Sequence, residues 1–198
     1  MSQRRGRGAW QGGWWSGARP VPSRNFNARP PGEVVDLVVV HSISLPPGEF
    51  GGEYIEALFT NRLDVSAHPF FATLQGLEVS AHFLIRRDGS LLQFVSCDDR
   101  AWHAGASVWR GRSRCNDYSI GIEVEGLEGG VFEPTQYQAL ARTLRQLAAR
   151  YPVTEVVGHE HVAPGRKCDP GPGFDWAQLR KRLRRHSPRL WPCIGEGP

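Results

Sequence analysis

A short segment near the carboxyl end of the chain concentrates ionisable side chains. Residues 158–176, GHEHVAPGRKCDPGPGFDW, contain His159, His161, Lys167 and Asp169 among glycines and prolines. Prolines remove backbone donors and fix φ, so we expect a loop with a defined path here. Loops of this kind carry function more often than packing, which makes these side chains candidates for a chemical site.

Two histidines and an aspartate could bind a metal ion together. His41 ends the β-branched run VVDLVVV and His159 follows the run VTEVV, so both are expected at the ends of neighbouring strands. Asp169 lies ten residues beyond His159 and can return to the same place. Two imidazoles and a carboxylate with an open fourth position suit catalytic zinc. The spacing leaves His161 as a rival, because it forms an HxH pair with His159.

Hydrophobic patterns predict the elements that would hold these residues. We expect strands at 34–40, 118–126 and 153–157, a hairpin at 82–95 around Asp88-Gly89, and helices at 53–63, from Pro134 to about Tyr151, and at 174–185. Strands that alternate with helices in this order predict an α/β fold. The expected fold is a single domain with a central mixed β-sheet flanked by helices.

The strand at 118–126, YSIGIEVEG, alternates between two faces. Its isoleucines and valine point to one face, and Glu123 and Glu125 point to the other. A glutamate in such a pattern is usually exposed to solvent, and we expect this of Glu125. Outside this strand, His68 and His82 are expected to have structural roles.

Charge and composition divide the chain into a body and two basic ends. Residues 1–13 are rich in glycine and arginine and are expected to form a flexible tail, residues 14–185 the domain, and residues 186–198 a basic, proline-containing tail. The body at 34–179 holds 12 Lys/Arg against 18 Asp/Glu. A nucleic-acid partner is therefore not expected, because it would require a basic patch in the body.

Two further features bear on the cellular location. No apolar run approaches the ~20 residues needed to cross a membrane, and the start MSQRRGRGAWQGGWW has no apolar segment of a signal peptide. The four cysteines form no CxxC pair and are expected to be free thiols. We therefore expect a cytoplasmic protein, without a membrane partner.

Five segments carry a resemblance to a known family. They are VVVHSISLPPGEFGG, VSAHFLIRRDGSLLQFV, RAWHAG, RCNDYSIGIEVEG and GHEHVAPGRKCDPGPGFDW, in this order. Together they resemble the cytoplasmic 1,6-anhydro-N-acetylmuramoyl-L-alanine amidases of the AmpD type, which have the zinc amidase and peptidoglycan-recognition fold. The resemblance covers about residues 14 to 185. It implies an enzyme that hydrolyses the amide between N-acetylmuramic acid and L-alanine in small soluble muropeptides from cell-wall turnover. The sequence does not determine the oligomeric state, for which we expect a monomer.

The resemblance also assigns roles residue by residue. By motif, His41, His159 and Asp169 would be the ligands of one zinc ion per chain. Glu123 matches the catalytic glutamate of the family and would take up a proton. Lys167 matches its catalytic lysine and would stabilise the developing oxyanion.

Substrate contacts and departures from the family are also implied. Trp102 in RAWHAG and Arg114 in GRSRCND fall on segments that line the substrate groove in such enzymes. Ser42 stands where the family often has asparagine, and Glu78 where relatives can carry a basic residue. Cys168 precedes the aspartate ligand and could compete for zinc.

Three alternative functions are disfavoured by the sequence. A zinc amidase that acts on intact peptidoglycan outside the cytoplasm is disfavoured by the missing signal segment. A non-catalytic muropeptide-binding module would have no need of all three ligands together with Glu123 and Lys167. A nucleic-acid binder with basic tails is disfavoured by the acidic body.

Overall fold

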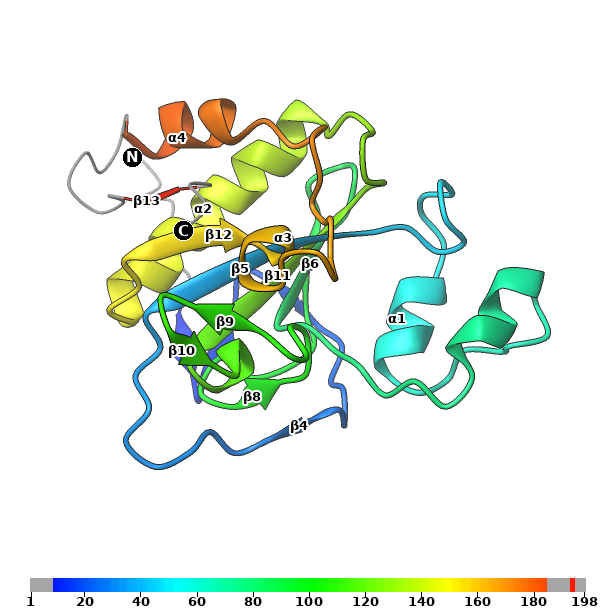
Figure 1. Ribbon diagram of the computed structural model, residues 1–198, viewed down its shortest axis with the longest axis horizontal. Helices are drawn as coiled ribbons and strands as arrows, with labels where there is room; N and C mark the ends of the chain where they lie inside the picture. The colour runs from blue at the N-terminus through cyan, green and yellow to red at the C-terminus, as the bar shows by residue number, and fades with distance from the viewer. Residues whose placement is uncertain (1–8, 185–192, 195–198) are drawn as a thin grey trace, which may run out of the picture.

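The computed structural model describes residues 9–184 and 193–194, and a seven-stranded mixed sheet forms its centre (Figure 1). The strand order is β13-β12-β5-β11-β6-β7-β3. These strands are β3 (Arg19–Pro20), β5 (Leu37–Ile43), β6 (Phe83–Ile85), β7 (Leu91–Gln93), β11 (Ser119–Glu125), β12 (Glu155–Gly158) and β13 (Cys193–Ile194). Neighbours from β13 to β6 pair in parallel, and β7 pairs antiparallel with β6. The predicted mixed sheet is confirmed.

Helices and short strand pairs surround this sheet. The helices are α1 (Tyr54–Phe59), α2 (Pro134–Arg150), α3 (His159–Val162) and α4 (Trp176–Arg184), with 3-10 helices η1 (Pro69–Leu74) and η2 (Cys115–Asp117). The antiparallel pairs are β1 (Trp10–Gln11) with β2 (Trp14–Trp15), β4 (Phe26–Asn27) with β8 (Arg100–Ala101), and β9 (Val108–Trp109) with β10 (Arg112–Ser113). None of the helices in the described part of the chain is long and apolar enough to span a membrane.

Helices α2 and α4 cover one face of the sheet (Figure 1). The first residue of α2 is Pro134, whose missing N–H costs nothing at that position. The predicted helical stripe of α2 packs on the apolar side of the central strands. The buried side chains are Val38, Val40, Ile120, Ile122 and Val124 from the sheet, and Tyr137, Leu140, Leu144, Leu147, Leu179 and Leu183 from the helices. Each such leucine contributes about 1.5–3 kcal/mol by its burial.

The opposite face is covered mainly by irregular chain. The segment 100–118, with β8, β9, β10 and η2, lies there (Figure 1), and its Trp109 and Tyr118 pack against Leu37 and Val39 of β5. Helix α1 and η1 pack beside this segment, over the β6–β7 hairpin. This second face, with its polar side chains and loops, is where a site can form.

The ends of the chain differ from the prediction. The tail predicted at 1–13 overlaps β1, because the ring of Trp10 stacks on Trp15 at 6.1 Å and meets the edge of Tyr151. The tail predicted at 186–198 contains β13, which pairs in parallel with β12. The remainder of both predicted tails lies outside the described residues.

Two predicted boundaries were also wrong. The helix predicted at 53–63 ends at Phe59, and Asn61 has a φ of 58°, a left-handed conformation that an α-helix cannot continue. The strand predicted at 34–40 continues through His41, because β5 stays paired with β11 as far as Ile43.

The exposure predicted for Glu125 was wrong as well. Its side chain is buried at 1% exposure. The carboxylate accepts hydrogen bonds from the Arg86 guanidinium at 2.8 Å and from the backbone N–H of Gly51 at 2.8 Å. A buried charge is tolerated when it is paired and hydrogen-bonded in this way.

The parallel register brings three chemical residues to one edge of the sheet. Glu123 of β11 lies directly opposite His41 of β5. On the other side of β5, Gly158 lies opposite Val40, so His159 comes next to His41. The three neighbouring strands therefore place two imidazoles and a carboxylate side by side.

Candidate active site

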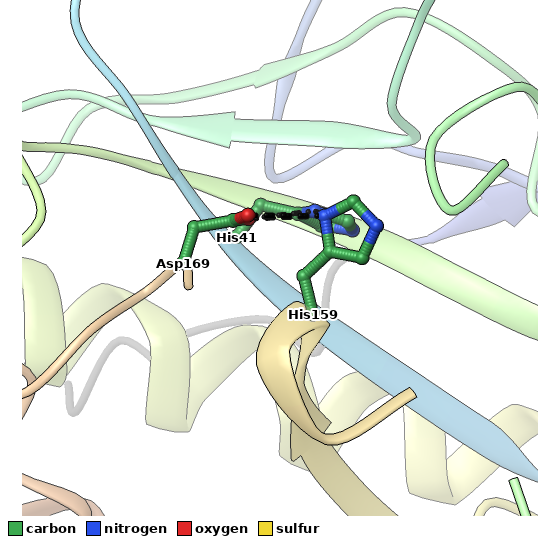
Figure 2. Close-up of side chains that lie close together, drawn as sticks. All are labelled: His41, His159 and Asp169. Atoms are coloured by element: carbon green, nitrogen blue, oxygen red, sulfur yellow. Dashed lines mark hydrogen bonds and ion pairs between the residues drawn. The ribbon is translucent and has the colours of Figure 1, made fainter. Parts of the chain in front are cut away.

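His41, His159 and Asp169 converge in a buried cluster (Figure 2). The Nδ1 atoms of the two histidines are 3.0 Å apart. Oδ2 of Asp169 is 3.1 Å from Nδ1 of His41 and 3.2 Å from Nδ1 of His159. The three residues that the sequence singled out are therefore brought together from a strand, a helix start and a loop.

The loop that carries Asp169 is anchored at two points, Arg166 and Asp169. The backbone N–H of Glu160, in α3, donates to the carbonyl oxygen of Asp169 at 2.8 Å. The Arg166 guanidinium donates to the carbonyl oxygens of Ala104 and Ala106 at 2.7 and 2.6 Å. These bonds hold Asp169 beside His159, which is the first residue of α3.

The donor atoms of the cluster fit a divalent cation. Nε2 of His159 is 3.1 Å from the carbonyl oxygen of Ala104, which can only accept, so this nitrogen carries a proton and Nδ1 is the atom that faces His41 and Asp169. Burial first, and then the neighbouring His159, lower the pKa of His41 to about 4, so His41 is neutral. Lone pairs held this close together repel unless a cation binds them. Two imidazoles and a carboxylate match the ligands of a catalytic zinc site.

A cavity of about 250 Å³ opens onto this cluster. Glu123, Lys167 and Trp102 line it together with the three cluster residues. The remaining lining residues are Ser42, Ile43, Leu58, Phe59, Leu77, Val79, Ser80, His103 and Glu128. A substrate in this cavity would meet a carboxylate, an ammonium group and an aromatic ring next to the candidate metal ligands.

Glu123 lies in surroundings that disfavour its charge. Its side chain is buried, and its Oε2 atom has no hydrogen-bond partner in the described part of the chain. Burial first, and then the carboxylate of Asp169, raise the pKa of Glu123 well above its ordinary value, while the charge of Lys167 opposes this. A buried carboxylate with a raised pKa and a free oxygen is typical of a general base.

The two residues expected to contact substrate lie in different places. Trp102 lines the cavity, and its indole N–H donates to Oδ1 of Asn27 at 2.8 Å. Arg114 is exposed, pairs with Asp117 at 2.9 Å, and is not among the residues that line the cavity. The contact implied for Arg114 would need a substrate that extends beyond this cavity.

The rival histidine His161 is excluded from the cluster by its own hydrogen bond. Its Nδ1 accepts the backbone N–H of Gly158 at 2.8 Å and so caps the start of α3. The structural roles expected of His68 and His82 are also seen: their Nδ1 atoms accept the backbone N–H groups of Phe70 and Gly121 at 3.1 and 3.0 Å.

The positions that depart from the family lie around the cluster. Ser42 lines the cavity. Glu78 is exposed and does not line it. Cys168 is an exposed free thiol and is not one of the three residues grouped as metal ligands among the described residues.

One residue of the site was missed by the sequence analysis. Nδ1 of His103 lies 3.0 Å from Nε2 of His41, on the side away from the cluster. His103 belongs to the irregular segment after β8, where no periodicity indicates which way a side chain points. The motif RAWHAG was the available signal, and it did not separate a packing histidine from a functional one.

Comparison with known proteins decides the family. The family model of the N-acetylmuramoyl-L-alanine amidases matches residues 31–172. The chain belongs to the N-acetylmuramoyl-L-alanine amidase family. The 1,6-anhydro-N-acetylmuramyl-L-alanine amidase AmpD of Escherichia coli strain K12 is 56% identical over 170 residues, which are 85% of this chain and 93% of that relative. The resemblance drawn from the sequence motifs is confirmed.

Solved structures of amidases agree with this family. A crystal structure of a selenomethionine derivative of AmpD is 52% identical, covers 88% of this chain and 99% of its own, and gives a TM-score of 0.86. The amidase AmiD from E. coli, solved in complex with anhydro-N-acetylmuramic acid-L-Ala-D-gamma-Glu-L-Lys, is 29% identical with a TM-score of 0.55. That match covers 81% of this chain and 66% of AmiD. This chain thus shares the overall fold of amidases in the family.

Proposed function

We propose that this chain hydrolyses the amide between N-acetylmuramic acid and L-alanine in soluble 1,6-anhydro-muropeptides, in the cytoplasm, during peptidoglycan recycling. The observation that carries the proposal is the convergence of His41, His159 and Asp169 beside Glu123, whose Oε2 atom has no hydrogen-bond partner among the described residues. The anhydro sugar is suggested by the name of the E. coli relative and by the ligand of AmiD. A monomer is sufficient for this reaction, because one chain supplies every residue named here.

We assign one zinc ion to Nδ1 of His41, Nδ1 of His159 and the carboxylate of Asp169. When bound, the ion would act as a Lewis acid on the scissile carbonyl and make water a better nucleophile. The polar atoms that fix the other side of each imidazole favour this assignment, because they leave the two Nδ1 lone pairs pointing at one place.

The remaining roles belong to side chains of the cavity. Glu123 would accept a proton at Oε2 from the attacking water and return it to the departing amine nitrogen. The ammonium group of Lys167 would stabilise negative charge on the carbonyl oxygen as the amide is attacked. The ring of Trp102 would pack on the sugar. Each of these groups lines the same cavity.

Metal content and activity of ligand variants test the proposal. His41→Ala, His159→Ala and Asp169→Ala should each lose most of the zinc found by mass spectrometry of the purified protein, together with activity on one anhydro-muropeptide. His161→Ala is the matched control and should keep its zinc, because its imidazole caps α3 instead of joining the cluster. Loss of zinc in His161→Ala with retention in His159→Ala would refute the ligand assignment.

A further inference from the structure

The far side of the candidate ligand His41 is connected to a chain of polar groups that the proposed reaction does not use. Nε2 of His41 is 3.0 Å from Nδ1 of His103. Nε2 of His103 is 3.2 Å from the hydroxyl oxygen of Ser119. That hydroxyl donates to the carbonyl oxygen of Cys115 at 2.5 Å, and a carbonyl can only accept.

The carbonyl of Cys115 therefore sets the direction of each hydrogen bond in the series from Ser119 through His103 to His41. Since the proton of Ser119 is used on Cys115, its oxygen must accept from His103, whose Nε2 then carries the proton. Nδ1 of the neutral His103 ring is left with a lone pair and accepts from Nε2–H of His41. Nδ1 of His41 is consequently unprotonated and faces His159 and Asp169.

The structure makes room for the His103 ring at one residue of β11. A Cβ atom built on Gly121 would lie 2.4 Å from Cγ and 2.6 Å from Nδ1 of His103, so only glycine allows the ring to lie there. Ser119, Gly121 and Glu123 occupy alternate positions of this strand and share one face. Strand β11 thus carries in succession the hydroxyl of Ser119, the space that Gly121 leaves for the His103 ring, and the candidate general base Glu123.

We propose that His103 and Ser119 are positioning residues that fix His41 as an Nδ1 ligand. The inference rests on the proposed zinc site and extends it to two residues that do not touch the metal. Hydrogen-bonded partners behind a ligating histidine orient the ring and raise its basicity, and their loss typically lowers metal affinity about 10–100-fold.

Nuclear magnetic resonance of histidine side chains tests the hydrogen-bond directions. In the zinc-loaded protein labelled with 15N-histidine, we expect protonated Nε2 and unprotonated Nδ1 for both His41 and His103. A proton on Nδ1 of His103, or coordination of zinc through Nε2 of His41, would overturn the proposal.

Zinc affinity measured by competition with a chelator tests the contribution of each residue. His103→Leu should weaken zinc binding about 10–100-fold. His103→Asn should recover part of this loss, because its side-chain oxygen can accept from His41. Ser119→Ala should weaken zinc binding about 3–10-fold, within what one lost hydrogen bond costs.

The matched control is Ser107→Ala. Ser107 accepts the backbone N–H of Cys115 at 3.0 Å, so Ser107 and Ser119 both support the same residue from buried positions. Ser107→Ala should leave zinc affinity within about twofold, because the Ser107 hydroxyl bonds the backbone of Gly105 and Cys115, whereas the His103 ring bonds Ser119. Equal losses of zinc affinity in Ser107→Ala and Ser119→Ala would mean that Ser119 acts only by supporting Cys115, and would refute the proposal.

The outcomes separate this inference from the proposed function. If the unmodified protein binds no zinc, the proposed function fails together with the ligand assignment. If zinc binds and His41→Ala abolishes it, but His103→Leu and Ser119→Ala bind with unchanged affinity, the inference alone fails. Thermal unfolding of each zinc-free variant shows which ones are folded, and the resonance experiment on the unmodified protein stands if a variant does not fold.

Discussion

The buried carboxylate of Glu123, when charged, lowers the stability of the folded protein. Burial and the Asp169 carboxylate raise its pKa well above the ordinary value, so the folded protein binds a proton more tightly than the unfolded chain does. Stability is then lost as the pH rises above the unfolded pKa of ~4.3, and the full cost applies above the folded pKa. A neutral side chain of the same shape avoids this cost.

Glu123→Gln should therefore raise the unfolding temperature of the zinc-free protein near neutral pH, with a smaller gain at about pH 4. Activity should fall about 10²–10⁴-fold, as for the loss of a general base. Glu128→Gln is the control, because Glu128 lines the same cavity from an exposed position and should change neither quantity much. A lower unfolding temperature in Glu123→Gln would contradict this account of the site.

Lys167 should influence the pKa of the Glu123 carboxylate. Its positive charge lowers the pKa of Glu123, so Lys167→Met should move the acidic limb of the kcat/KM profile to higher pH. The maximum should also drop about 10²–10³-fold if the ammonium group stabilises the oxyanion. Lys167→Arg keeps the charge and should keep the acidic limb in place. An unmoved limb in Lys167→Met would show that the two residues are not coupled.

At the scale of elements, Glu125 joins β11 to the loop that precedes α1. Its carboxylate accepts from Arg86 of the β6–β7 hairpin and from the backbone of Gly51. The same Arg86 donates to the carbonyl oxygen of Gly52 and to Glu56 of α1, at 2.8 and 3.1 Å. Two glutamates two residues apart on one strand thus have different tasks: Glu123 lines the cavity and Glu125 fixes a neighbouring loop.

Glu125→Ala should lower the free energy of unfolding by about 1.5–3 kcal/mol, because it removes a buried charged hydrogen bond of Arg86, which keeps only Glu56 as a carboxylate partner. The folded variant should still bind zinc. Glu33→Ala is the comparison, since it removes a more exposed pair with Arg112 and should cost about 0.2–1 kcal/mol. Urea unfolding of the zinc-free proteins measures both values. Equal losses in the two variants would mean that the Glu125 pair is no stronger than a surface pair.

The sequence predicted those helices and strands whose own residues form a recognisable hydrophobic pattern. The β-branched run of β5, the alternation of β11 and the Pro134 stripe of α2 each identify an element from neighbouring residues alone. Strands β1 and β13 are two residues long and have no such pattern. The Trp10 ring of β1 meets the distant Tyr151, and β13 pairs with the distant β12.

The roles of single residues in the site also depend on distant contacts that a local sequence pattern does not report. Glu123 and Glu125 have identical local patterns, and only the position of Arg86 makes one of them structural. The choice of His159 over His161 depends on the cap at Gly158, and the contact of His103 depends on how an irregular segment folds over β11. Family motifs pointed to the proposed ligands because they record such distant contacts indirectly.

At the scale of the whole molecule, the site lies where the sheet meets its irregular cover. Three adjacent strands supply His41, Glu123 and the start of α3, and the loop of Asp169 closes the arrangement through Arg166. An apolar cleft of about 360 Å³ adjoins the cavity and shares Ser42 with it. His41, Glu123, His159 and Asp169 are buried and line the cavity, so a substrate must place its scissile amide inside the cavity to reach them.

A recessed site should favour small soluble fragments over a cross-linked wall. We therefore expect the initial rate of peptide release from a soluble anhydro-muropeptide to exceed that from insoluble sacculi, at equal low amounts of substrate, by a large factor. Specificity is a ratio of kcat/KM values, so the comparison requires initial rates at low substrate, with peptide release followed by mass spectrometry. A soluble muropeptide that carries the ordinary reducing sugar separates the effect of size from that of the anhydro ring. Release from sacculi at the soluble rate would instead favour an amidase that acts on intact peptidoglycan, while leaving the zinc ligands and Glu123 in the same roles.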